Sequence, residues 1–132
     1  MATTTLNGAG SQVNTGKESI VIKLALDGIE GGRSLNVTGF GPAVIQAGHV
    51  IIQDTVSKDY KPMPLATNDT VYGTLPTDHV YVGVLRSSVL KATPMAGILT
   101  NGTANPEATP FSMTTILAAF KTAVPFIAWR AD

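Results

Sequence analysis

Apolar and polar residues alternate in the segment SIVIKLAL, residues 19–26. Successive side chains of a strand point to opposite faces of a sheet, so four apolar residues share one face here: Ile20, Ile22, Leu24 and Leu26. The dipeptide Asp27-Gly28, a common tight-turn sequence, follows at once. The pattern therefore predicts a half-buried strand over residues 19–26 that ends in a turn.

Six later stretches also have strand character. Residues 79–90, HVYVGVLRSSVL, are the most strand-like, because β-branched and aromatic residues favour strands. Residues 60–65, YKPMPL, contain two prolines, which restrict this stretch to a sheet edge or an extended connection. The other predicted strands cover residues 33–40, 43–45, 49–53 and 125–129.

One helix is predicted, in the segment PFSMTTILAAFKTAV, residues 110–124. Its apolar side chains recur at helical spacing and form a single stripe: Met113, Ile116, Leu117 and Phe120. Thr109-Pro110 or Ser112 can begin the helix, because a hydroxyl caps free amides and proline is tolerated in the first turn. Pro125 disfavours helix at the preceding residue, so the helix should end there.

These elements predict a mainly β fold with one short C-terminal helix, either a small β-sandwich or a barrel-like domain. The chain has 132 residues, which suits one domain with a modest core. Residues 1–18 are polar, small and without hydrophobic period, so we expect a flexible, extended N-terminal arm. Residues 19–132 are expected to form a single β-rich domain.

The composition of the chain limits which partners it is expected to have. Nine basic residues balance nine acidic ones and no Lys/Arg run occurs, so we expect no nucleic-acid partner. No apolar run approaches the roughly 20 residues that span a bilayer, and the first residues do not resemble a signal peptide, so we expect no membrane partner. Only 14% of residues are charged, which predicts that partners or further copies of the chain cover part of the surface.

Candidate catalytic and metal-binding residues are few. His49 and His79 lie far apart without metal-ligand spacing, and each begins a strand-like run. Asp54 and Asp59 flank Lys58; the pair could serve acid/base chemistry, but the pattern is more typical of a polar hairpin tip. No nucleotide loop or G-x-S-x-G motif is present, and cysteine is absent. We therefore expect no enzyme, cofactor or metal.

The segment ILTNGTANPEATPF, residues 98–111, is rich in turn-forming residues and raises the question of a binding loop. Calcium would require several acidic oxygens, and Glu107 is its only acid. Asn101-Gly102 predicts a tight turn with Gly102 at positive φ, and Asn105-Pro106 predicts a second turn. We expect the segment to reverse the chain ahead of the helix.

The order of these pieces resembles the small capsid-decorating proteins of tailed bacteriophages, most closely the head-fibre type. The resemblance covers residues 40–129 and is carried by short motifs in matching order: Gly48-His49-Val50, Lys61-Pro62-Met63, Gly83-Val84-Leu85, Gly102-Thr103-Ala104-Asn105 to Pro110, and the closing helix and strand. Ala104 departs from the pattern, since the family usually has valine before this asparagine.

The resemblance implies a function and partners. Such proteins are β-rich homotrimers on the outer surface of the capsid, where they bind the major capsid protein and stabilise the shell. The chain would be made in the bacterial host cytoplasm and reside on the capsid exterior of the virion. The family's N-terminal arm commonly contacts the shell, which implies these capsid-binding residues: Thr3, Thr4, Thr5, Leu6, Asn7, Val13 and Asn14.

A carbohydrate- or cell-surface-binding module on the virion is the alternative function. Sugar sites favour exposed aromatic rings. The chain offers few of them as candidates: Tyr60, Tyr72, Tyr81 and Trp129. Tyr81 lies in the strand-like VYV segment, where we expect it in the core, which weakens this reading.

Overall fold

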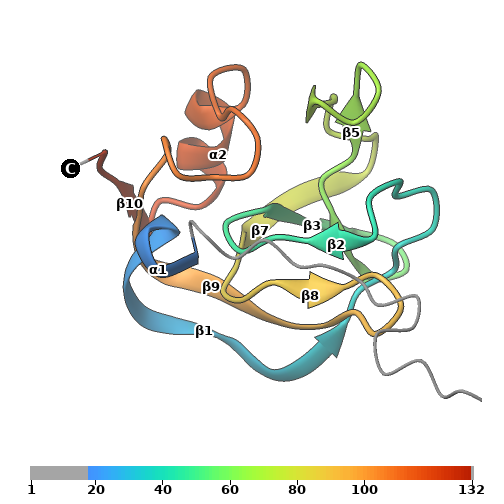
Figure 1. Cartoon of the computed structure of the whole chain (residues 1–132), viewed down its shortest axis with the longest axis horizontal. Helices are drawn as coiled ribbons and strands as arrows, with labels where there is room; N and C mark the ends of the chain where they lie inside the picture. Colours follow the sequence, from blue (N-terminus) through green and yellow to red (C-terminus); the bar gives the residue numbers. More distant parts are fainter. Residues whose placement is uncertain (1–17, 132) are drawn as a thin grey trace, which may run out of the picture.

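The computed structural model describes residues 18–131, in which strands predominate (Figure 1). The elements, in chain order, are α1 (Glu18–Val21), β1 (Ile22–Ser34), β2 (Val44–Ile45), β3 (Val50–Asp54), β4 (Tyr60–Pro62), β5 (Leu65–Ala66), β6 (Val71–Tyr72), β7 (His79–Leu85), β8 (Val89–Leu90), β9 (Met95–Ala104), α2 (Leu117–Ala123) and β10 (Ile127–Trp129).

The main sheet has six strands. Five follow the order β1-β9-β7-β3-β4 with antiparallel neighbours, and β10 pairs in parallel with β9. Two small antiparallel pairs, β2 with β8 and β5 with β6, complete the strands. In Figure 1, β1 runs along the lower edge while α2 and β5 rise at the top. The predicted mainly β class with a short helix near the C-terminus is confirmed.

Both faces of the central strands are buried. Ile52, Val84 and Leu99 join a core cluster beneath α2 and the β5–β6 hairpin. Their chain neighbours Ile51, Leu85 and Ile98 join a second cluster on the opposite face, together with Leu35, Phe40 and Ile45. Adjacent strand residues point to opposite faces, so each central strand contributes to both clusters. This double burial explains the continuous strand character of residues 79–85.

The helix confirms part of its prediction. Met113, Ile116 and Phe120 are buried, Leu117 is half-buried, and the helix ends at Ala123 ahead of Pro125. The predicted start is wrong, because α2 begins only at Leu117 and Ile116 makes no side-chain cap. The Thr109 hydroxyl instead contacts the carbonyls of Pro106 (3.0 Å) and Phe111 (2.7 Å), closing the preceding loop.

The predicted first strand is wrong in its start and in its buried face. Residues 18–21 form the short helix α1, and the strand begins at Ile22. Val21 is fully buried, whereas Ile20, Leu24 and Leu26 are exposed by 51%, 50% and 64%. Register shifts in the β1–β9 pairing break the simple alternation on which the prediction depended.

Two predicted turns are strand interiors. Asp27-Gly28 lies within β1, Asn101-Gly102 lies within β9, and Asp27 pairs with Asn101. A side chain on Gly28 would collide with the carbonyl oxygen of Ile98, and one on Gly102 with that of Leu24. The glycines therefore permit close approach of two irregular strands, and only Gly102, at φ 155°, has the expected positive φ.

Gly102→Ala should lower the free energy of unfolding by about 1–3 kcal/mol, because the added methyl group must displace the β1 backbone. Gly97→Ala in the same strand is the matched control, since a methyl group there meets only Arg86 at 3.8 Å. Urea unfolding of both variants measures the difference. Equal stability of the two variants would contradict the close-approach explanation.

Of the remaining predictions, some are confirmed, one is wrong and one falls on residues that the structure does not describe. Residues 60–62 form the edge strand β4, and 127–129 form β10, as expected. The strand predicted over 33–40 is mostly a loop, with a turn at Thr38 and Gly39, because Phe40 turns inward to fill the second cluster. The predicted arm lies outside the described residues except for Glu18, which begins α1. No helix within residues 18–131 is long and apolar enough to cross a membrane.

Candidate functional site

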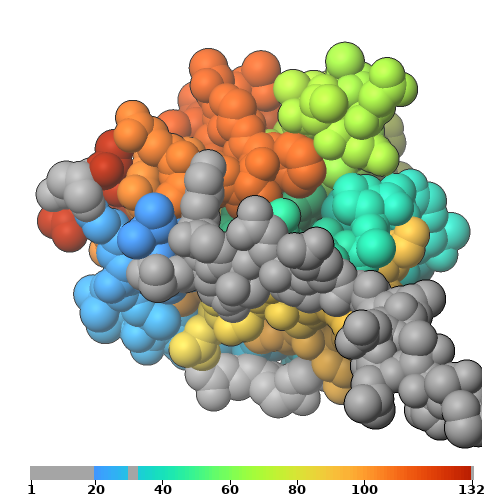
Figure 2. Space-filling view, in the orientation of Figure 1, coloured from blue at the N-terminus to red at the C-terminus, as the bar shows by residue number. Residues whose placement is uncertain are grey.

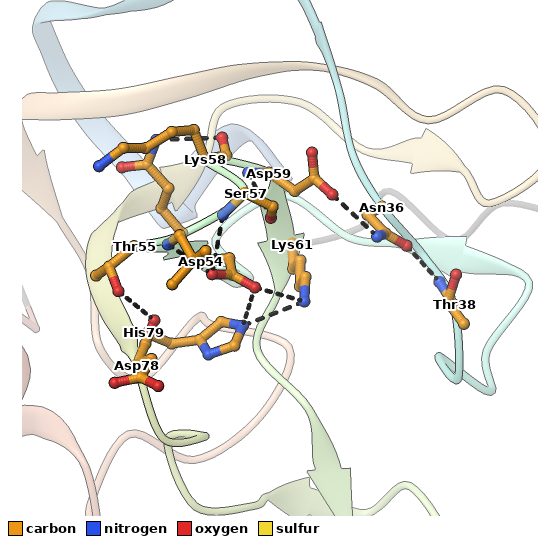
Figure 3. A network of polar contacts seen from close by, with 12 residues as sticks. Asn36, Thr38, Asp54, Thr55, Ser57, Lys58, Asp59, Lys61, Asp78 and His79 are labelled. Carbon is orange, nitrogen blue, oxygen red and sulfur yellow. Dashed lines mark hydrogen bonds and ion pairs between the residues drawn. The ribbon is translucent and has the colours of Figure 1, made fainter.

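A polar network surrounds the turn between β3 and β4 (Figure 3). Asp54 ends β3 and pairs with His79 of β7, and its amide donates to the Asp59 carbonyl at 3.0 Å in the turn that leads to β4, which carries Lys61. Lys61 Nζ lies 3.2 Å from His79 Nε2 and 3.7 Å from Asp54 Oδ2, while His79 Nε2 lies 3.8 Å from the same carboxylate oxygen. Three strands thus bring a carboxylate, an ammonium and an imidazole together.

The hydrogen-bond partners of His79 indicate the tautomer of its ring. Its Nδ1 lies 2.8 Å from the Thr77 carbonyl oxygen, which can only accept, so Nδ1 carries the proton. Nε2 therefore accepts a hydrogen bond from the Lys61 ammonium. The nitrogen that would act as a base is already occupied, so the arrangement holds the ammonium in place and is not suited to proton abstraction.

Backbone donors keep Asp54 ionised. The amides of Val56 and Ser57 donate to Asp54 Oδ1 at 2.8 and 3.3 Å. These bonds lower the pKa of Asp54, with smaller contributions from His79 and Lys61. The predicted polar hairpin tip is confirmed: Lys58 occupies the left-handed region at φ 66°, and Asp59 accepts a hydrogen bond from Asn36 at 3.3 Å.

A cavity of about 250 Å³ opens beside this network. It lies between the loop of residues 36–41 and the β5–β6 hairpin, which meet at the right of the molecule in Figure 2. Its walls combine apolar and charged groups: Asn36, Thr38, Gly39, Phe40, Gly41, Ile52, Lys61, Pro62, Pro64, Leu65, Asp69, Pro76 and His79. The arrangement is a small cavity with polar and apolar walls that sequence patterns did not reveal.

The two histidines have different surroundings. His79 begins β7, as expected of a strand-end residue. His49 instead lies in the core, where its Nε2 donates to the Met63 carbonyl at 3.0 Å and its ring packs edge-on against Phe40, Tyr72 and Phe111. Burial lowers the pKa of His49 to about 4, so it is neutral at pH 7.

The candidate sugar-stacking rings face the core. Tyr72 is buried and its hydroxyl accepts the Val50 amide proton at 3.0 Å. Tyr81 and Trp129 both pack edge-on against Phe120 at 5.5 Å, and Tyr60 packs against the second cluster. None of these four rings offers the fully exposed face that the alternative function requires.

Exposed apolar residues lie at the start of β1. This β1 apolar row consists of Leu24 and Leu26 of β1 together with Ile20 of the preceding α1, each at least half exposed. Within residues 18–131, β1 is the edge strand of the main sheet and pairs only with β9. Sheet edges are ordinarily protected by charge, proline or a covering element, so an apolar edge of this length is suited to contact with another chain.

The predicted capsid-binding residues, Thr3 to Asn14, lie outside the described residues. Sequence reasoning identified Asp54 and His79 separately but missed their contact with Lys61, because that contact depends on strand pairing across β3, β4 and β7.

Comparison of the chain with protein-family models, curated proteins and solved structures finds no match.

Proposed function

We propose that the protein is a structural virion protein that binds the outer surface of a bacteriophage capsid as a homotrimer and stabilises the shell. The observation that carries the proposal is the exposed β1 apolar row, on a strand that pairs only with β9 among residues 18–131. Its partners are further copies of the chain and the major capsid protein, and its place is the capsid exterior.

The β1 apolar row supports self-association, because covering its exposed side chains with another subunit would be energetically favourable. Leu24 and Leu26 expose half or more of their side chains, and covering a leucine side chain fully stabilises an assembly by about 1.5–3 kcal/mol. The low charge of the chain, 14% of residues, has the same implication, since a fully solvated small domain ordinarily carries more. A subunit interface along β1 accounts for both features.

The motifs that carry the phage resemblance have structural roles in this fold. A side chain on Gly83 would collide with the Leu99 carbonyl oxygen, and one on Gly48, at φ 88°, with Val21. Lys61-Pro62-Met63 forms β4 and the fully buried Met63 that follows it. These motifs therefore describe close packing of a β scaffold, which supports a structural protein more than an enzyme.

Deleting residues 2–16 should abolish co-sedimentation with expanded capsids while leaving the trimer intact. Three arms on one trimer engage the shell together, so weak individual contacts add up through effective concentration. Sedimentation measures attachment, and light scattering after size exclusion measures the number of copies. We expect three copies for the parent and for the deletion variant.

Leu24→Glu tests the second part of the proposal, trimer formation through β1. A charge on the β1 apolar row opposes burial of that row between subunits, so this variant should be monomeric although it keeps residues 2–16. A parent that is monomeric at micromolar concentration, or a deletion variant that still decorates capsids at full occupancy, would contradict the proposal.

A further inference from the structure

We propose that the cavity between residues 36–41 and the β5–β6 hairpin binds a single sugar ring. The inference is independent of the capsid role, since the cavity lies at the opposite edge of the sheet, beside β4, and uses none of the β1 apolar row. Its volume of about 250 Å³ is below the 300–1,000 Å³ of sites for drug-sized ligands, which points to a ligand of one ring.

The first polar group of the site is a fixed ammonium. Lys61 lines the cavity, and its Nζ is held by His79 Nε2 at 3.2 Å and Asp54 Oδ2 at 3.7 Å. An ammonium has three donors, so Lys61 retains a donor for a ligand oxygen after these contacts. Because two partners already restrict the lysine, less side-chain freedom is lost when a ligand binds.

The second polar group of the site is the carboxylate of Asp69. Asp69 lines the cavity from the tip of the β5–β6 hairpin, and within the described residues no hydrogen bond or ion pair occupies its carboxylate. Thr67, Asn68 and Asp69 all have left-handed backbone conformation, with φ of 52°, 56° and 62°, which is uncommon for residues with side chains. This conformation carries Asp69 back toward the loop of residues 36–41.

Gly41 provides the space for that carboxylate. A methyl group at Gly41 would collide with Asp69 Oδ2, so the absence of a side chain lets the carboxylate lie against the cavity wall. Gly41 does not have positive φ, so a larger residue there would act by displacing the Asp69 carboxylate and not by straining the backbone.

The two polar groups that line the cavity, Lys61 and Asp69, select the chemistry of the ligand. Lys61 can donate to a ligand and Asp69 can accept from one, and a hydroxyl group both donates and accepts, so a polyhydroxylated ligand can pair with both. A sugar offers Asp69 its hydroxyl protons and Lys61 its oxygens. Phe40, Pro64 and Pro76 supply apolar wall for the C–H face of the ring.

Amide resonances of the full chain, titrated with D-glucose, D-galactose and N-acetyl-D-glucosamine, test the proposal, with glycine as the zwitterionic comparison. We expect saturable shifts in the millimolar range for at least one sugar, confined to residues around 38–41, 61–65 and 69. No saturable shift with any sugar, shifts centred elsewhere, or tighter binding of glycine each overturns it.

Asp69→Asn should weaken the binding of that sugar by about tenfold, the size of one lost charge-assisted hydrogen bond. Asp78→Asn is the matched control, because Asp78 has the same left-handed backbone, at φ 60°, and does not line the cavity. Gly41→Ala is the second variant, since it keeps the carboxylate but displaces it, and it should weaken binding with an unchanged melting temperature. Parent-like affinity of Asp69→Asn overturns the site, and capsid co-sedimentation should be the same for all variants.

Discussion

Replacing Phe120 with alanine should lower the free energy of unfolding by about 3–5 kcal/mol. Phe120 is fully buried and packs edge-on against both Tyr81 and Trp129. It is the buried side chain through which α2 joins the core cluster beneath it. Alanine would leave a cavity that β7 and β10 cannot close without giving up their ladder bonds to β9.

Urea unfolding followed by fluorescence of Trp129, the one tryptophan of the chain, measures this change directly. All variants are compared at one protein concentration, because association shifts apparent stability. Phe126→Ala is the matched control, since that phenylalanine is 72% exposed and its loss should change stability by no more than about 0.5 kcal/mol. A Phe120→Ala variant that unfolds like the parent would show that the core does not depend on this ring.

Lowering the pH from 6.5 to 4 should remove about 3 kcal/mol of stability through His49. The pKa of His49 is about 4 in the folded chain and 6.5 when unfolded, because burial opposes its charged form. Below pH 6.5 the unfolded state takes up a proton that the folded state refuses, so stability falls with pH until the folded pKa is reached. Well above pH 6.5 the histidine is neutral in both states and this contribution is complete.

Free energies of unfolding at several pH values between 7 and 4 test this prediction. His49→Phe should flatten the profile in this window, whatever the stability of that variant at pH 7. The contribution of Asp54 falls in a different window, because its lowered pKa means that its stabilisation is lost only below the ordinary range of aspartate. A parent profile that is flat from pH 6.5 to 4 would mean that His49 can be protonated in the folded state.

Sequence patterns correctly predicted those elements that are regular in the structure. Residues 79–85 and 127–129 are strands, and Pro125 ends the helix region as expected. The segment 19–26 failed, because its clean alternation describes a flat strand, whereas β1 is interrupted by register shifts and its exposed residues include Leu24 and Leu26.

The glycine dipeptides show why local signals were misleading. Asp27-Gly28 and Asn101-Gly102 have the composition of hairpin turns, and each would read as one in isolation. They lie across from each other in the β1–β9 ladder, where glycine is required by the neighbouring backbone. The sequence alone does not distinguish a glycine that turns the chain from one that lets a neighbouring strand come close. That distinction requires knowing which strands pair.

The candidate site was less predictable than the fold. Asp54 is placed next to Lys61 by a hairpin that the sequence indicated, but His79 reaches them through a β3–β7 pairing that no local pattern predicts. The meeting of Asp69 with Gly41 depends on how the β5–β6 hairpin stands over a distant loop. The burial of His49 was hidden for the same reason, since its aromatic neighbours Phe40, Tyr72 and Phe111 come from three separate segments.

The strand order also determines when the chain can fold during its synthesis. β1 comes early in the sequence, yet its ladder partner β9 spans Met95–Ala104, and the β10 strand that extends the other edge of β9 comes later still. Loop closure across most of the chain must precede that pairing, and such non-local sheets form slowly. The nascent chain therefore presents Leu24 and Leu26 unpaired until translation is nearly complete, and at high expression this interval favours contact between neighbouring nascent chains.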